Sequence, residues 1–68
     1  MIYVNGQAVH DAGEAPTIRD VLVGLEIDPE TAGIAVAVDA EVARRGVWPT
    51  HTVPDGARVE IVTATQGG

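Results

Sequence analysis

The sequence contains no cysteine, no serine and no lysine, and its only aromatic residues are Tyr3 and Trp48. Without cysteine there can be no disulfides, thiolate metal sites or cysteine nucleophiles. Without serine, and with threonines that have no evident base beside them, nucleophilic catalysis by this chain has little support. No apolar run approaches the roughly 20 residues of a membrane span, and no basic segment near Met1 indicates a secretion signal. We therefore expect a soluble cytoplasmic protein without a membrane partner.

What the sequence does contain is aliphatic and acidic. It has 68 residues, 46% of them hydrophobic, which suits one small domain whose core is built from Val, Ile, Leu and Ala. Ten acidic residues against four arginines give a net charge of −6, which opposes binding to nucleic acid. The acidity suits solubility, an interpretation we favour over steering toward a basic enzyme surface.

The sequence indicates no metal site and no bound cofactor. Neither His10 nor His51 has a second ligand at helical spacing, and no acidic pair lies in a loop with calcium-ligand spacing. The only basic cluster is Arg44-Arg45, for which a pair of loop charges is favoured over a partner contact.

The first half of the chain predicts a β-hairpin followed by one helix. Apolar residues alternate from Ile2 to Val4, and Asn5-Gly6 accepts the positive φ angles of a tight turn back through residues 8–10. Thr17 can cap a helix with Asp20 three residues on. Asp28-Pro29 is expected to end this helix. Its apolar stripe has the i, i+3, i+4, i+7 spacing, at Ile18, Val21, Leu22 and Leu25.

The second half predicts three strands and one long loop. Residues 34–38 are continuously apolar, which favours a strand covered on both faces. Asp39-Ala40 turns the chain into a short strand at residues 41–43. Residues 44–51 are expected to be irregular, with Trp48 pinning the loop to the core. A turn at Pro54-Asp55-Gly56 precedes the last strand, residues 58–63, whose Val59 and Ile61 face one side while Arg58, Glu60 and Val62 face the other.

These elements predict an α+β fold with two layers, a mixed sheet of about five strands and one packed helix. A single helix can cover only one face of the sheet, and the terminal strands are expected to pair in parallel at its centre. Residues 1–63 would form the domain, and residues 64–68 a flexible tail ending in Gly-Gly. The predicted core comprises Ile2, Val4, Ile18, Val21, Leu22, Leu25, Val36, Val38, Val59 and Ile61.

The final Gly67-Gly68 carries the main functional signal. Glycine has no Cβ, so Gln66 and Gly67 could thread a narrow enzyme channel and present the unhindered carboxylate of Gly68. That carboxylate could attack the α-phosphate of ATP, and the resulting acyl-adenylate would be open to a sulfur nucleophile. The alternative is a frayed, glycine-rich end without a role.

The chain as a whole resembles the ThiS sulfur carriers of thiamin biosynthesis. The likeness covers essentially all of it, although the family usually has Asn-Gly where this chain has Asp39-Ala40. It rests on the order of Ile2-Tyr3-Val4-Asn5-Gly6, Val21-Leu22, Ala35-Val36-Ala37-Val38, Arg45, Trp48, Asp55-Gly56-Ala57-Arg58-Val59-Glu60-Ile61 and Gly67-Gly68.

The resemblance implies a ubiquitin-like β-grasp fold and a protein that is a co-substrate rather than an enzyme. Gly68 would be adenylated by a separate E1-like adenylyltransferase of the ThiF type, which uses ATP, and converted to a thiocarboxylate. The carrier, a monomer when free, would then donate sulfur to a thiazole synthase of the ThiG type.

Three alternatives remain open. The chain could carry sulfur for molybdopterin or another sulfur pathway, or it could be a ubiquitin-like protein modifier that conjugates through Gly68. The missing lysines argue against self-linked chains. It could also be a plain β-grasp interaction module, in which the diglycine would be incidental.

Overall fold

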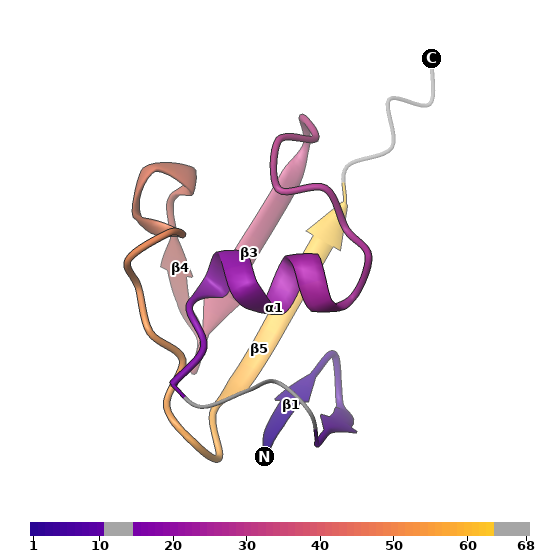
Figure 1. The fold of residues 1–68 in the computed structure, drawn as a ribbon, viewed down its shortest axis with the longest axis vertical. Helices are drawn as coiled ribbons and strands as arrows, with labels where there is room; N and C mark the ends of the chain where they lie inside the picture. The colour runs from indigo at the N-terminus through magenta and orange to yellow at the C-terminus, as the bar shows by residue number, and fades with distance from the viewer. Residues whose placement is uncertain (11–14, 64–68) are drawn as a thin grey trace.

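The computed structural model describes residues 1–10 and 15–63 and arranges them as a five-stranded sheet with one helix across one face (Figure 1). The strands lie in the order β2-β1-β5-β3-β4. In chain order the elements are β1 (Ile2–Val4), β2 (Gln7–Val9), α1 (Ile18–Gly24), β3 (Ile34–Val38), β4 (Glu41–Ala43), the 3₁₀ helix η1 (Arg45–Val47) and β5 (Arg58–Thr63).

The sheet is mixed, and its first and last strands are neighbours. β1 pairs with β5 in parallel, whereas β1 with β2, β3 with β4 and β3 with β5 are antiparallel. β5 therefore has a partner on each side and lies at the centre of the sheet. This confirms the predicted two-layer β-grasp arrangement, including the central parallel pair.

Helix α1 begins where the sequence predicts and ends earlier. The hydroxyl of Thr17 accepts from the backbone N–H of Asp20, and the carboxylate of Asp20 accepts from the N–H of Thr17, which completes a capping box. The helix stops at Gly24, so the prediction that Asp28-Pro29 ends it is wrong.

The early stop comes from a left-handed residue that the sequence does not signal. Glu26 has a φ of 62°, which turns the chain so that the N–H of Ile27 donates to the carbonyl of Leu22 and that of Glu26 to the carbonyl of Val23. This is the hydrogen-bond pattern of a Schellman motif. As a result Ile27 packs against the core, and the predicted core residue Leu25 is 36% exposed.

Apart from Leu25, every predicted core residue is buried. Trp48 is 2% exposed, and its indole N–H donates to the carbonyl of Ala43 at 2.9 Å, so the prediction that it pins the loop is confirmed. That loop is not wholly irregular, because residues 45–47 form the 3₁₀ turn η1. The core gains five residues beyond the predicted set, Ile34, Ala43, Trp48, Val53 and Ala57.

Strand β3 is covered on one face only, so the prediction of a strand covered on both faces is wrong. Ile34, Val36 and Val38 are buried under α1, whereas Ala35 is exposed and Ala37 is half-buried. The single helix has no counterpart on the other side of the sheet in the described ranges (Figure 1). The apolar run therefore combines core residues with an apolar outer surface.

Turns form at both places where the sequence predicts them between adjacent strands, although positive φ angles are predicted only for Asn5-Gly6. Asn5 and Gly6 have φ angles of 49° and 86° and join Val4 to Gln7 in the first hairpin. Asp39 and Ala40, with φ angles of 49° and 68°, join β3 to β4 in the same way.

Candidate functional site

The predicted site residues Gln66, Gly67 and Gly68 fall in residues 64–68, outside the described part of the chain. The described strand that precedes them is β5. β5 is anchored by its inward residues Val59 and Ile61, which are buried beneath α1, as predicted. Its last residue, Thr63, pairs with Ile34 at the start of β3. The chain thus enters its last five residues from the central, doubly flanked strand of the sheet.

The face of the sheet opposite α1 has an apolar surface beside the end of β5. We call Ala35, Ala37, Val42 and Val62 the open-face patch. The strand register places Ala35 opposite Val62 and Ala37 opposite Val42, so the patch crosses three adjacent strands. Val42 is 79% exposed and Val62 is 62% exposed. Since two of its residues are alanines, the patch offers a low surface that a partner backbone could approach closely.

Polar groups border the open-face patch toward β1. Glu60 and Arg58 project from β5 on the same face as Val62, and Tyr3 lies across from Arg58 in the parallel pair. An open hollow lies here, lined by Tyr3, Asn5, Gly6, Gly56, Arg58, Val59 and Glu60. An apolar centre with a polar border is the composition of a protein docking surface.

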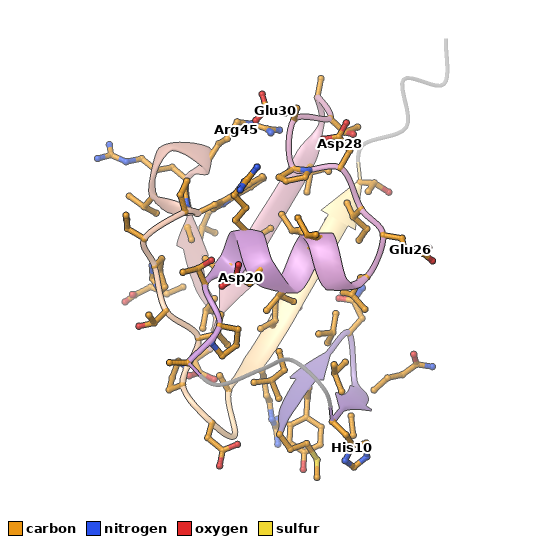
Figure 2. The ribbon with its side chains drawn as sticks, in the orientation of Figure 1. His10, Asp20, Glu26, Asp28, Glu30 and Arg45 are labelled. Carbon is orange, nitrogen blue, oxygen red and sulfur yellow. The ribbon has the colours of Figure 1, made fainter. Side chains whose placement is uncertain are left out.

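The loop between α1 and β3 carries three acidic residues and is contacted by one cation, the guanidinium of Arg45. Glu26, Asp28 and Glu30 lie in this loop, and Figure 2 shows Asp28 and Glu30 at the opposite end of the molecule from His10. The loop leads directly into Ile34, the strand partner of Thr63.

The sequence favours a pair of loop charges at Arg44-Arg45 over a partner contact, and in the structure Arg45 makes contacts within the chain. Its guanidinium donates to the carbonyls of Pro29 and Thr31, the second at 2.6 Å. The same group lies 4.6 Å from the centre of the Trp48 ring, within cation–π distance. Arg45 therefore ties the loop before β3 to the loop after β4.

Two carboxyl groups have perturbed acidity, and neither belongs to β5 or to the open-face patch. The backbone N–H and then the hydroxyl of Thr17 lower the pKa of Asp20. The amino group of Met1 donates to the side chain of Asp55 and, with its positive charge, lowers the pKa of that carboxyl. Both are structural contacts, one at a helix cap and one at the N-terminus.

The described residues contain no arrangement suited to metal chemistry. In residues 1–10 and 15–63, no three His, Asp or Glu side chains gather closely enough to hold a metal ion. No helix within these ranges has the length and apolarity to cross a membrane. What the described residues offer is the central strand β5, which ends at Thr63, and an exposed apolar surface beside that end.

The sequence signal for the open-face patch was present but was interpreted as burial. An apolar run through residues 34–38 and an exposed position at Val62 cannot all be covered when the fold has one helix. Alternate residues of the five-residue apolar run point to opposite faces of the sheet, and one helix covers only one face. The sequence therefore contained a signal for an exposed apolar surface.

Comparison with known proteins gives a consistent result. A family model described as "ThiS family" matches residues 1–68. A crystal structure of the thiamine biosynthesis protein ThiS from Geobacter metallireducens is 28% identical, with a TM-score of 0.79 over 98% of this chain and 97% of that one. A solution structure of a thiamine biosynthesis protein from the same organism is also 28% identical, with a TM-score of 0.78 over 98% and 86%. A search of curated protein sequences finds no match.

Proposed function

The chain belongs to the ThiS family, and we propose that it carries sulfur for thiamine biosynthesis as a thiocarboxylate on Gly68. The family match over the whole chain and the likeness to the Geobacter protein support a sulfur-carrier role in this pathway. Proteins of this family are small carriers rather than catalysts. The observation that carries the proposal is a family match that extends to residue 68, the second glycine of the pair.

The proposed activation proceeds in two displacements. An oxygen of the Gly68 carboxylate attacks the α-phosphorus of ATP, and pyrophosphate leaves with the electron pair of the broken P–O bond. A sulfur nucleophile at the oxidation level of sulfide then attacks the acyl carbon, and AMP leaves. In the product the sulfur is bound to the acyl carbon and remains nucleophilic, so it can be transferred to the thiazole precursor. A separate adenylyltransferase supplies the ATP site.

We assign the open-face patch to docking of that adenylyltransferase. The six residues that follow Val62 can span at most about 20 Å. An enzyme that holds Gly68 in its ATP site must therefore place protein surface within that distance of Val62. The exposed, apolar side chain of Val62 and the adjoining Ala35 are suited to such a contact. The acidic loop nearby suits a partner whose surface is cationic around bound ATP.

The test uses the full chain with the adenylyltransferase and thiazole synthase from the same source. After incubation with ATP and a sulfur donor, intact mass spectrometry should show replacement of one C-terminal oxygen by sulfur, and thiazole product should follow. Deleting Gly68 should abolish pyrophosphate exchange without unfolding the domain. Replacing Gly67 by a bulky residue should do nearly the same, because a side chain would collide with a channel shaped for glycine.

Three results would change the assignment. If the chain lacking Gly68 still supports pyrophosphate exchange, the carboxylate role is wrong. A thiocarboxylate that forms without thiazole product, and transfers its sulfur to a molybdopterin precursor or another acceptor, would retain the carrier chemistry and change the pathway. Conjugation to lysines of other proteins, with no thiocarboxylate, would identify a modifier instead.

A further inference from the structure

The side chain of Asn5 bonds to both main-chain groups of Ile61, a residue 56 positions later. Its amide nitrogen Nδ2 donates to the Ile61 carbonyl at 3.1 Å, and the Ile61 N–H donates to Oδ1 at 2.9 Å. Both bonds are partly buried. The backbone N–H of Asn5 also donates to the carbonyl of Val59 at 2.9 Å. Asn5 is thus bonded to β5 three times.

These bonds continue the main-chain hydrogen bonding of β5 beyond the point where β1 ends. The parallel pairing of β1 with β5 reaches only Val4 opposite Val59, while β5 continues to Thr63. The carboxamide of Asn5 presents one donor and one acceptor, as a peptide unit of a neighbouring strand would. On the side that faces β1, the main chain of Ile61 is therefore bonded by the Asn5 side chain in place of a strand residue.

On its other side, β5 is paired with β3 to its end. The register continues from Val36 opposite Ile61 to Ile34 opposite Thr63. Asn5 and β3 therefore flank Ile61 on its two sides, with Asn5 bonding its main chain, two residues before the last described residue. From Ile61 to Thr63, β5 is flanked by β3 alone among the strands, so Asn5 is the last group that contacts it from the β1 side among the bonds described here.

The position requires an asparagine for two reasons at once. The φ of 49° at Asn5 is left-handed, a conformation that glycine, asparagine and aspartate adopt most readily. The bonds to Ile61 require a donor and an acceptor on one short side chain. Glycine meets only the first requirement, and aspartate lacks the donor. The two substitutions therefore separate the turn from the contact with Ile61.

We propose that Asn5 is a positioning residue for activation of the C-terminus, and this rests on the proposed function above. By holding Ile61, it orders Val62 and Thr63 before the adenylyltransferase binds. A strand end that is already ordered loses less conformational entropy on docking, which favours binding of the carrier. Asn5 touches neither ATP nor Gly68 in this scheme, and its effect passes through β5.

The first experiment follows amide hydrogen exchange in the free protein, in the wild type, Asn5→Gly, Asn5→Asp and the control Thr17→Ala. In Asn5→Gly the Ile61 amide should exchange about 2- to 10-fold faster than in the wild type, the effect of losing one hydrogen bond. Thr17→Ala weakens the helix cap at a site remote from β5, so it should leave the exchange rate of Ile61 relative to Val59 unchanged. This measurement needs no partner enzyme.

The second experiment measures ATP–pyrophosphate exchange with the cognate adenylyltransferase, at a temperature where circular dichroism shows all variants fully folded. Asn5→Gly should raise the KM for the carrier by about 2- to 10-fold with little change in kcat, because the added ordering cost falls on binding. Asn5→Asp retains the turn and the acceptor but sets a carboxylate oxygen against the Ile61 carbonyl, so it should also raise the KM. It also serves as the test variant if Asn5→Gly does not fold. Thr17→Ala should match the wild type.

Each outcome has a distinct meaning. The positioning role is overturned if the KM of the Asn5 variants equals that of the wild type, or if Thr17→Ala raises the KM as much as they do. Unchanged exchange at Ile61 in Asn5→Gly would overturn it as well. If the wild type and Thr17→Ala are both inactive with the enzyme, the proposed function fails and the positioning role fails with it.

Discussion

Replacing Ala40 with glycine should stabilise the protein, although glycine usually weakens a fold. Ala40 has a φ of 68° in the turn between β3 and β4, a left-handed conformation that is strained for a residue with a Cβ. Relief of a left-handed conformation is worth roughly 1–2 kcal/mol. Against this, glycine gives the unfolded chain extra freedom worth roughly 0.5–1 kcal/mol. The net expectation is a gain of about 0.5–1 kcal/mol in the free energy of unfolding, or about 2–8 °C in Tm for a domain of this size.

A matched control makes the same chemical change at a position without strain. Ala8 is exposed in β2 and is absent from the residues with positive φ. Ala8→Gly should therefore lower the free energy of unfolding by about 0.5–1 kcal/mol. Urea denaturation followed by Trp48 fluorescence, and thermal unfolding followed by circular dichroism, measure both variants. The reasoning is refuted if Ala40→Gly destabilises the protein as Ala8→Gly does.

Three further changes test the core, the helix cap and the docking surface. Leu22 has no exposed area, so Leu22→Ala should lower the free energy of unfolding by about 2–5 kcal/mol, measured by urea denaturation. A loss near zero would contradict its central place in the core. Because Thr17 lowers the pKa of Asp20, that carboxylate stabilises the fold fully above its unfolded pKa of about 4, and the contribution disappears as the pH falls through the lower folded pKa. The stability difference between wild type and Asp20→Asn should accordingly shrink as denaturation is repeated below about pH 4, and a constant difference would exclude this linkage. Val62→Glu should weaken adenylyltransferase binding by roughly tenfold, ~1.4 kcal/mol by calorimetry, whereas Val23→Glu on the exposed side of α1 should not; equal effects would remove the open-face patch from the interface.

Local signals in the sequence predict most of the fold, because the turns and the helix start form where the local residues favour them. Asn5-Gly6 predicts the first hairpin, and Thr17 with Asp20 predicts the start of the helix. The end of the helix escapes prediction because Glu26 is neither glycine nor asparagine, yet it adopts the left-handed conformation there. Burial of Ile27 in place of Leu25 follows from that turn.

The site is less predictable because its parts depend on contacts between distant segments. The apolar character of residues 34–38 is visible in the sequence, but the face to which each residue points depends on where the single helix packs. The bond between Asn5 and Ile61 requires the register of two strands 56 residues apart, and nothing local to either residue reports it. The roles of Gln66, Gly67 and Gly68 stay predictions, since these residues lie outside the described ranges.

The central place of β5 also bears on how the protein is synthesised. On the ribosome, β5 emerges after every other described strand, although it joins the β1–β2 hairpin to the β3–β4 hairpin. A nascent chain that stops before residue 58 holds two hairpins with no strand between them, and isolated hairpins are marginally stable at best. Completion of the sheet therefore has to wait for the segment that precedes Gly67-Gly68. Chains that terminate before β5 is made should be left unfolded and open to proteolysis, so folded carriers with a defective end would arise only from stops after this strand.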